Sequence, residues 1–325
     1  MSDTADSTPT ETEPEHTQGA ASGTSLPADT ALPRLLARLP DEARPYALLA
    51  RWDRPVGIWL LYLPCLIGLL QMRVISGFAW QDLLWAVLFF VGAVAMRGAG
   101  CTWNDIADRE IDAQVARTAA RPIPAGLVTL RQAYIFLAAQ VAIGFVVWLF
   151  LPTVAKIVAI FALPLVGAYP FMKRITWWPQ AWLGFTFNWG ALVGGATALD
   201  AVTGASVILY LGLVAWTVAY DSIYALQDIE DDALIGVRST ARLFGESVLT
   251  AIFSFFMLAT LLVFAGMYFA GAGRLGALTA LVFFGHGLWQ TIQLNNSRDN
   301  ALPVFKSNVW AGLILVLGLL AATLI

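Results

Sequence analysis

Long runs of apolar residues follow one another from residue 55 to the end of the chain, and short polar segments separate them. A helix needs about 20 mostly apolar residues to cross the hydrocarbon core of a bilayer. About nine runs approach that length, so the pattern predicts an all-α fold, a multi-pass transmembrane bundle of about nine helices around a central cavity. The predicted spans are residues 55–72, 80–103, 131–151, 153–171, 180–199, 204–226, 248–270, 274–294 and 304–325.

The segment 153–171 is the least regular of these spans. It holds Lys156, Pro164 and Pro170. An internal proline is tolerated in a membrane helix where neighbouring helices satisfy the freed backbone groups. We therefore expect this segment to cross the membrane despite its prolines.

Two segments precede the first span. Residues 1–33 are rich in Ser, Thr, Pro, Glu and Ala, and no Lys or Arg stands before Arg34. This composition cannot bury enough apolar surface to order itself, and it resembles neither a secretory signal nor an Arg-rich mitochondrial transit peptide. We expect a disordered acidic tail at 1–33 and a transmembrane domain at 34–325, which begins with short amphipathic helices over 34–54 at the lipid surface.

The overall composition indicates a membrane protein. Hydrophobic residues make up 58% of the chain and charged residues 13%, whereas soluble domains are about 25% charged. Cys65 and Cys101 stand alone in apolar surroundings, which predicts neither a metal site nor a disulfide. We expect the lipid bilayer as a partner and no nucleic acid.

The basic residues predict the orientation in the membrane. If the N-terminus lies inside, sixteen of the 19 Lys and Arg fall on inner segments, and only Arg73, Lys156 and Arg274 fall on outer ones. Cytoplasmic loops carry an excess of Lys and Arg. We therefore expect the N-terminus, and the polar segments after the second and sixth spans, to face the cytoplasm. With the composition of the first 30 residues, this favours a bacterial cell inner membrane.

A cluster of acidic residues follows the second span. The stretch NDIADREID covers residues 104–112 and contains Asn104, Asp105, Asp108 and Asp112. On a helix, residues 104, 108 and 112 share nearly one face. Like charges at this spacing repel, so the pattern makes sense where a cation lies between them, and oxygen-only ligands suit Mg2+ or Ca2+. The plain alternative is a solvated acidic loop.

A second acidic stretch, YDSIYALQDIEDD at 220–232, follows the sixth span. Tyr220, Tyr224, Asp228 and Asp232 recur every four residues and form one stripe, with Asp231 near its end. Two carboxylate clusters at one membrane surface suit bridged divalent ions. The ligand that most needs such ions is a diphosphate, because Mg2+ binds through a few carboxylates plus substrate phosphates. The two motifs together make the solvated loop the weaker interpretation.

These two motifs resemble those of the UbiA superfamily of intramembrane prenyltransferases. Three further stretches, RWDRPVG at 51–57, RTAARPIPAG at 117–126 and YPFMKRITWWPQ at 169–180, are similar to its 4-hydroxybenzoate polyprenyltransferase branch. The resemblance runs from about Leu48 to the C-terminus, and Arg238 stands where the branch more often has Lys. It implies Mg2+-dependent transfer of a polyprenyl group from polyprenyl diphosphate to the ring of 4-hydroxybenzoate, ortho to the hydroxyl, in ubiquinone synthesis.

Basic residues near the motifs are candidates for binding the diphosphate. Arg binds phosphate oxygens bidentately, although a positive-inside anchor is the plain alternative for each residue. The candidates are Arg117, Arg121, Lys173, Arg174 and Arg238, of which the resemblance to YPFMKR favours Lys173 and Arg174. The expected metal ligands are Asn104, Asp105, Asp108, Asp112, Asp228, Asp231 and Asp232. The expected catalytic set is Asp105, Asp108, Asp228, Asp232 and Arg174.

Such a reaction also requires groups that stabilise a carbocation and groups that bind the acceptor, and residues in or near the spans are candidates for both. Departure of diphosphate leaves an allylic cation, which the faces of Tyr220 and Tyr224 would stabilise; simple packing is the alternative for both. An anionic aromatic acid needs a cation for its carboxylate, and Arg54 and Arg97 are candidates because a charge so near a span is costly unless paired. Arg97 pairing with an Asp is the alternative.

Two other functions stay open at this point. One is a UbiA-type transferase for another acceptor, such as dihydroxynaphthoate or haem, against which RWDRPVG and YPFMKR argue. The other, from a different class, is a membrane cation transporter. A transporter places carboxylates at mid-membrane along its pathway, whereas here they gather at the ends of spans. Turnover with prenyl diphosphate and Mg2+, without an ion gradient, separates the two classes.

Overall fold

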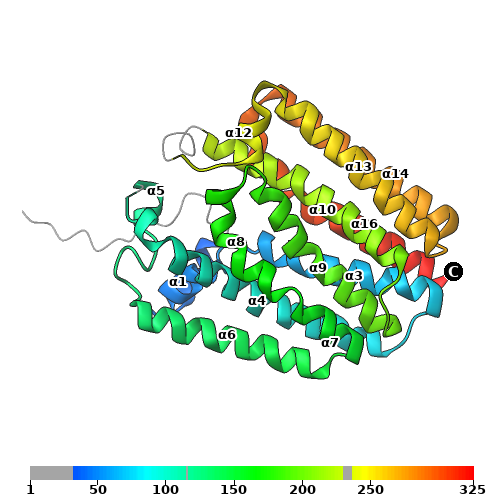
Figure 1. The fold of residues 1–325 in the computed structure, drawn as a ribbon, viewed down its shortest axis with the longest axis horizontal. Helices are drawn as coiled ribbons and strands as arrows, with labels where there is room; N and C mark the ends of the chain where they lie inside the picture. Colours follow the sequence, from blue (N-terminus) through cyan, green and yellow to red (C-terminus); the bar gives the residue numbers. More distant parts are fainter. Residues whose placement is uncertain (1–31, 115, 230–235) are drawn as a thin grey trace, which may run out of the picture.

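The computed structural model of the chain describes residues 32–114, 116–229 and 236–325 (Figure 1). Side chains at positions 35, 116, 117 and 228 lie outside this description. The described part is all helical, as predicted. The expected tail at 1–33 falls almost entirely outside the described residues, so its disorder stays a prediction.

The first half of the chain forms long membrane-spanning helices together with several short ones. Two short helices precede the first span, as expected, and a short one follows the first acidic motif. In chain order the elements are α1 (Pro33–Arg38), α2 (Arg44–Leu49), α3 (Val56–Ser76), α4 (Gln81–Asp112), α5 (Ala116–Ala119), α6 (Leu130–Phe150), α7 (Thr153–Ile160), α8 (Leu163–Ile175) and α9 (Pro179–Leu199).

The second half repeats the pattern of long spans joined by short elements. A single 3-10 turn continues α10 into the second acidic motif. The elements are α10 (Gly204–Ala225), η1 (Leu226–Asp228), α12 (Thr240–Phe244), η2 (Gly245–Ser247), α13 (Val248–Phe269), α14 (Gly273–Asn296), η3 (Arg298–Asn300), α15 (Ala301–Lys306) and α16 (Asn308–Leu324).

The predicted spans correspond to helices in the described part of the chain. Eight helical segments there are long and apolar enough to cross a membrane. The remaining predicted span, 180–199, is α9. This helix has the length of a span but carries Gln180, Thr186 and Asn188 among its apolar residues. The prediction of an all-α, multi-pass bundle is therefore confirmed.

Two differences from the predicted spans concern helices α4, α7 and α8. Helix α4 continues nine residues past the predicted end at 103, because NDIADREID contains neither Gly nor Pro and prolongs the helix to Asp112. The span at 153–171 is split between α7 and α8, and Pro164 occupies the first turn of α8, where a missing N–H costs no helical bond. Both differences shape the functional end of the bundle.

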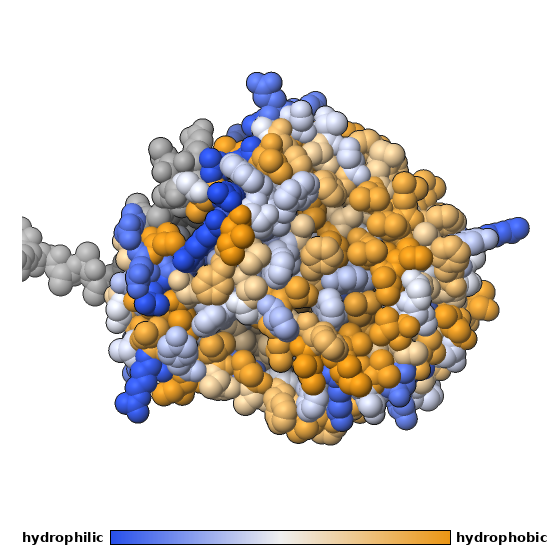
Figure 2. All heavy atoms as spheres, viewed as in Figure 1, coloured by the Kyte–Doolittle hydropathy of each residue, from blue (hydrophilic) through white to orange (hydrophobic). Residues whose placement is uncertain are grey.

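Helix α10 is the most buried of the eight candidate spans. It packs against α9 and α13, while α3 packs against α9 and α16. The α3–α9 contact is close because Gly68 and Gly194 lie directly against the opposite backbone, as small residues allow in membrane bundles. Large apolar side chains cover much of the outer surface, as expected for lipid contact (Figure 2).

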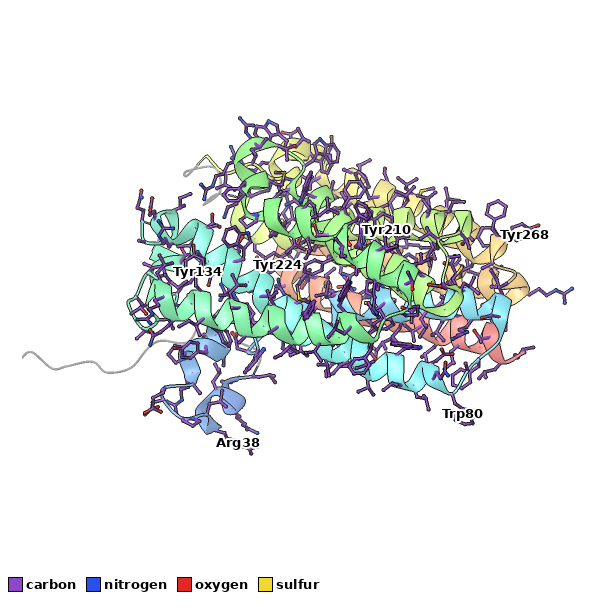
Figure 3. The ribbon with its side chains drawn as sticks, turned by 60° about the horizontal axis from the view of Figure 1, so that its bottom comes forward. Arg38, Trp80, Tyr134, Tyr210, Tyr224 and Tyr268 are labelled. Carbon is purple, nitrogen blue, oxygen red and sulfur yellow. The ribbon has the colours of Figure 1, made fainter. Side chains whose placement is uncertain are left out.

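The two ends of the bundle differ in what they present. Trp80 and Tyr268 lie at one end and Arg38 and Tyr134 at the other (Figure 3). Helices α5 and α12, which follow the two acidic motifs, lie at the same end as Arg38 (Figure 1). The motif end therefore carries the loops that can form a site.

Candidate functional site

The carboxylates of the first motif are buried at the motif end of α4. Asp105, Asp108 and Asp112 are at most 4% exposed. Each is neutralised by basic residues from another part of the chain, as buried carboxylates must be. The extension of α4 by NDIADREID holds all three on one rigid helix.

The last turn of α8 supplies the partners of Asp108. Lys173 Nζ forms an ion pair with Asp108 Oδ2. Arg174 Nη2 donates to Asp108 Oδ1 at 2.8 Å and to the carbonyl of Ala107 at 3.2 Å. Asn104 Nδ2 also donates to Asp108, at 3.1 Å. Asp108 is therefore held by three donors, two of them charged.

Arg121 joins the other two carboxylates of the motif. Its Nη1 lies 2.6 Å from Asp112 Oδ2 and 3.4 Å from Asp105 Oδ1. Arg121 comes from the turn after α5, which folds back over the end of α4. This places a predicted diphosphate ligand directly over the carboxylates of the first motif.

Arg51 is the main partner of Asp105. Its Nη2 donates to Asp105 Oδ1 and Oδ2 at 2.8 and 2.9 Å, and its Nη1 donates to Leu48 O at 2.7 Å. Burial alone would lower the pKa of Arg51, but the Asp105 carboxylate more than offsets this and raises the pKa. Arg51 also holds a φ of 58°, a left-handed conformation that persists where surrounding contacts impose it.

The segment after the second motif returns to α8 and α9. Arg238 donates its backbone N–H to Lys173 O at 3.2 Å and its Nη1 to Ile175 O at 2.6 Å. Thr240 N donates to Gln180 Oε1 at 2.9 Å, and Thr240 Oγ1 shares a 2.6 Å hydrogen bond with Ser222 of α10. These contacts hold residues 238–240 against the end of α8, the start of α9 and helix α10.

Part of the predicted site lies outside the described residues. Asp231 and Asp232 belong to the segment 230–235, and the side chains of Arg117 and Asp228 are not described. The backbone places Asp228 at the end of η1. The predictions on these four residues stay predictions, while the residues on either side of the segment reach the same hollow as Asn104 and Asp112.

That hollow consists of three adjoining cavities, and Arg121, Tyr169 and Tyr224 line all three. The first, which we call the mouth cavity, measures about 260 Å³ and brings Asn104 and Asp112 of the first motif beside Lys173, Arg238 and Asp221. Residues from both motif helices thus line one cavity at one end of the bundle. This agrees with the predicted common mouth.

The second cavity, which we call the inner cavity, extends towards the apolar interior. It measures about 280 Å³. Its polar end includes Asn104 and Asp105, and its apolar lining is Leu61, Met96, Val166, Leu183 and Phe187. A ligand with a charged head and a hydrocarbon tail fits such a lining.

The third cavity, which we call the arginine cavity, measures about 270 Å³ and lies between α3, α4, α10 and α15. Arg54, Arg97 and Lys306 line it. Arg54 Nε donates to Asp53 Oδ2 at 2.9 Å. The cavity collects both arginines predicted for a carboxylate, so an anionic acceptor fits it electrostatically.

Arg97 is the less constrained of the two predicted arginines. Its Nε is buried without a hydrogen-bond partner among the described residues, and its guanidinium lies 5.4 Å from the centre of the Phe187 ring. A Cβ at Gly57 would come within 2.9 Å of Arg97 Cζ. The missing side chain at Gly57 therefore leaves the room that Arg97 occupies.

The two predicted tyrosines behave differently. Tyr220 is 1% exposed, and its hydroxyl accepts a 3.0 Å hydrogen bond from Thr217. Tyr224 (labelled in Figure 3) lines all three cavities, and its ring centre lies 4.8 Å from that of Phe305 at a tilted angle. Tyr224 is thus the better placed of the pair to meet a ligand.

Arg51, Tyr169 and Asp221 also line the hollow, although they were not among the predicted site residues. All three stand in stretches that resemble the family motifs. A signal for Asp221 existed, because it stands seven residues before Asp228 on nearly the same helix face. A carboxylate inside an apolar span is expensive and usually functional.

The described side chains supply part of a divalent-ion site. Within residues 32–114, 116–229 and 236–325, no group of three or more His, Cys, Asp and Glu side chains lies close enough to hold a metal. Asn104 and Asp108 offer adjacent oxygen-bearing side chains, which suit Mg2+. A complete site needs carboxylates from the second motif, and its return segment reaches the same cavity.

Comparisons with known proteins agree with this geometry. The profile of the UbiA prenyltransferase family matches residues 61–323. The 4-hydroxybenzoate polyprenyltransferase, mitochondrial, of Homo sapiens is 41% identical over 298 residues, which cover 88% of this chain and 77% of that protein. The protein of the same name from Aedes aegypti is 43% identical over 290 residues, covering 86% of this chain and 64% of that protein.

Solved structures of similar fold belong to the same family. A UbiA homologue from Aeropyrum pernix K1 superposes with a TM-score of 0.67 at 26% identity, covering 82% of this chain and 97% of that one. A UbiA homologue from Archaeoglobus fulgidus, bound to GPP and Mg2+, superposes with a TM-score of 0.65 at 17% identity, covering 86% and 100%. At 17% identity the second likeness concerns the fold alone.

Proposed function

The chain belongs to the UbiA prenyltransferase family, and we propose that it transfers a polyprenyl group from a polyprenyl diphosphate to 4-hydroxybenzoate in ubiquinone synthesis. The new bond forms at the ring carbon ortho to the hydroxyl. One observation carries the proposal: a carboxylate-rich mouth, an apolar inner cavity and a cation-lined cavity adjoin one another at Arg121, Tyr169 and Tyr224.

The diphosphate is assigned to the mouth cavity. Mg2+ is the proposed ion, with Asn104, Asp105, Asp108, Asp112, Asp228, Asp231 and Asp232 as its candidate ligands, and when bound it neutralises the charge of the leaving diphosphate. Arg121, Lys173 and Arg238 line the same cavity and bind phosphate oxygens there; Arg117 and Arg174 are the further candidates.

Two basic side chains at the mouth are available to bind an anion. Lys173 and Arg174 share one carboxylate, Asp108. Their side chains are 29% and 41% exposed, so both can turn to a phosphate without leaving a cation buried and unpaired. Their positive charge stabilises the diphosphate more as its bond to the prenyl carbon breaks.

The prenyl chain and the allylic cation are assigned to the inner cavity. Its apolar lining excludes water from the cation, and Tyr224 presents an aromatic ring where all three cavities meet. Tyr220 supports this position by packing at 5.2 Å against Trp216. The cation thereby survives long enough to meet the acceptor ring.

The acceptor is assigned to the arginine cavity. Among the described residues Arg97 has a donor without a partner there, and Arg54, just before α3, lines the same cavity, so both are placed to bind the carboxylate of 4-hydroxybenzoate. The acceptor ring then lies between the bound carboxylate and the meeting point at Tyr224. A UbiA-type enzyme for an acceptor without a carboxylate would have no use for this cation pair.

The mouth is assigned to the cytoplasmic face of the cell inner membrane. The support is the distribution of Lys and Arg, since all but Arg73, Lys156 and Arg274 fall on the predicted inner segments. The protein is multi-pass in either orientation.

The test uses membranes that contain the chain, Mg2+, ring-labelled 4-hydroxybenzoate and a panel of prenyl diphosphates of different length. We expect a labelled, lipid-soluble product with at least one donor and none without Mg2+. Dihydroxynaphthoate is the matched alternative acceptor. Failure to label 4-hydroxybenzoate with any donor, with dihydroxynaphthoate prenylated instead, would overturn the assignment of the acceptor.

A further inference from the structure

Asp221 differs from the other acidic residues of the hollow in its partners. Asp105, Asp108 and Asp112 each accept charge-assisted hydrogen bonds from Arg or Lys. Among the residues that the structure describes, no hydrogen bond or ion pair within 4.0 Å reaches Asp221. Among the carboxylates that the structure describes here, those oxygens are thus the ones with no donor occupying their lone pairs.

The position of Asp221 joins the two substrate regions. It lines the mouth cavity, which holds the residues assigned to the diphosphate, and it lines the arginine cavity, which holds those assigned to the acceptor. Asp105 and Asp112 do not line the arginine cavity. A group that must act where donor and acceptor meet has to lie at this junction.

Its depth in the membrane agrees with that role. Asp221 stands seven residues before Asp228 on α10, and Arg97 stands seven residues before Asn104 on α4. Each stands two helical turns, about 10 Å, before the first predicted metal ligand of its segment. The two helices thus bring a cation and a carboxylate to the arginine cavity, where the acceptor ring would lie.

Charged groups share both cavities with Asp221: Asp112, Lys173 and Arg238 line the mouth cavity, Arg51, Arg54 and Lys306 line the arginine cavity, and Arg121 lines both. Arg97 of α4, Tyr169 of α8 and Tyr220 of α10 lie within electrostatic range of it. Arg97 is the cation among them, and the acceptor's carboxylate would occupy it. Binding of the acceptor would then engage the charge of Arg97 and leave the Asp221 carboxylate as an available base.

The reaction requires a base at this place. Breaking the bond between C1 and the bridging oxygen leaves its electron pair on the diphosphate. A carbon–carbon bond forms at the ring carbon ortho to the hydroxyl, which then carries both the prenyl group and a hydrogen. Loss of that hydrogen as a proton returns the C–H electron pair to the ring and restores its aromaticity.

We propose that Asp221 is a catalytic residue that accepts the ring proton from the prenylated intermediate at the junction of the two cavities. This inference rests on the proposed function and adds a residue to it. A carboxylate oxygen takes the proton, the neutral acid remains while the product leaves, and the proton then passes to water at the mouth. Such a general base contributes about 10²–10⁴-fold to the rate.

The test compares wild type with Asp221→Asn, which keeps shape and removes basicity. The acceptor is 4-hydroxybenzoate, either normal or deuterated at both positions ortho to the hydroxyl. We expect Asp221→Asn to lower kcat about 10²–10⁴-fold, with the KM of both substrates within a few-fold of wild type. Proton removal becomes rate-limiting, so the isotope effect of the variant exceeds that of wild type.

Two further variants keep the test decisive. Asp221→Glu retains a carboxylate and should recover part of kcat, which a purely structural role would not predict. Asp299→Asn is an exposed Asp in η3 and serves as the matched control with wild-type kinetics. The melting temperature in detergent, and binding of a non-reactive prenyl thiolodiphosphate, show whether Asp221→Asn is folded.

Each outcome decides one point. A folded Asp221→Asn with wild-type kcat, or with a lower kcat and an unchanged isotope effect, overturns the role of Asp221 as proton acceptor. If wild type itself forms no product from 4-hydroxybenzoate, the proposed function fails, and that failure is distinct from the failure of this inference.

Discussion

At the residue scale, Gly57 controls where Arg97 can lie. Any Cβ at position 57 would overlap the Arg97 guanidinium. Position 57 is the last of the stretch RWDRPVG, in which Arg54 was the predicted site residue. The structure gives this glycine a reason: it brings α3 close enough to α4 for Arg97 to line the arginine cavity.

We predict that Gly57→Ala displaces Arg97 and raises the KM for 4-hydroxybenzoate about tenfold or more. A lost charge-assisted contact to a desolvated carboxylate costs about 2–5 kcal/mol, and a partial displacement loses part of this. The KM for prenyl diphosphate should stay near wild type. Steady-state kinetics with each substrate varied in turn provide the measurement.

Gly285→Ala is the matched control for this change. Gly285 lies inside α14, and no atom lies within 4 Å of a Cβ built there. It should leave both KM values unchanged. Equal effects of the two substitutions, or a Gly57→Ala effect confined to the prenyl diphosphate, would contradict the role given to Gly57.

Arg174 and Arg54 should divide between the two substrates. Arg174 binds Asp108 at the mouth, whereas Arg54 lines the arginine cavity. Arg174→Ala is expected to lower the rate with every acceptor, because it removes a charge that stabilises the leaving diphosphate. Arg54→Ala is expected to weaken binding of the aromatic acid, and to do so less for an acceptor without a carboxylate.

The measurement is kcat and KM for both variants with 4-hydroxybenzoate and with an uncharged phenol of similar size. Arg131→Ala is the control, since Arg131 is exposed on α6. An Arg54→Ala variant that changes only the KM for prenyl diphosphate would show that this arginine serves the other substrate.

Single residues also show which parts of the site the sequence could predict and which it could not. The carboxylate motifs were visible because four acidic or amide residues recur at helical spacing. The partner of Asp105 was not visible, because Arg51 lies 54 residues away and only the fold brings the two together. Asn188 of α9 likewise bonds to a neighbouring helix: its amide donates to Leu213 O at 3.1 Å and Thr217 Oγ1 at 2.7 Å in α10.

At the element scale, breaks in helices place the functional ends. The α7–α8 break lets Pro164 begin a new helix whose last turn carries Lys173 and Arg174 to the mouth. The α15–α16 break does the same for Phe305 and Lys306, which line the arginine cavity. The sequence predicted one continuous span in each case, because hydropathy reports length and apolarity but not where a helix changes direction.

Asn308 holds the α15–α16 break. Its Nδ2 donates to Phe305 O at 3.1 Å and Gln290 Oε1 at 3.0 Å, and its Oδ1 accepts from Trp216 Nε1 at 2.8 Å. It is fully buried. One amide therefore ties the break to both α10 and α14.

We predict that Asn308→Leu lowers the free energy of unfolding by about 2 kcal/mol or more, because it leaves buried donors and acceptors without partners at about 1–3 kcal/mol each. It should also raise the KM for 4-hydroxybenzoate, since Lys306 loses its support. Thermal unfolding in detergent and steady-state kinetics are the readouts, with the exposed Asn295→Leu as control. Wild-type stability of Asn308→Leu would show that the break does not depend on this residue.

At the scale of the whole molecule, both motif helices end at one face of the bundle. The hydrophobic pattern predicted this arrangement correctly, since it follows from the number of crossings between the motifs. It could not predict the shape of the hollow, which depends on side chains from α3, α8 and α15 as well as the motifs. The ligands in the segment 230–235 lie outside the described residues.

The orientation of this face is open to a direct test. We predict that Asn296→Cys, at the motif end, reacts with a membrane-impermeant maleimide only in inverted vesicles, while Ala201→Cys at the opposite end reacts in right-side-out ones. Both positions are exposed. The unsubstituted chain, whose Cys65 and Cys101 lie inside the bundle, is the control. The reverse pattern of labelling would place the mouth outside.

The central claim is that both acidic motifs form one Mg2+-dependent diphosphate site. The most direct measurement is binding of a non-reactive prenyl thiolodiphosphate to the purified protein, for wild type, Asp108→Asn, Asp228→Asn and the exposed control Glu246→Gln. We predict tight binding with Mg2+, loss of binding after chelation, and at least about tenfold weaker binding for each Asp variant, which corresponds to about 1.4 kcal/mol. Wild-type affinity in either Asp variant, or affinity that does not depend on Mg2+, would contradict the account.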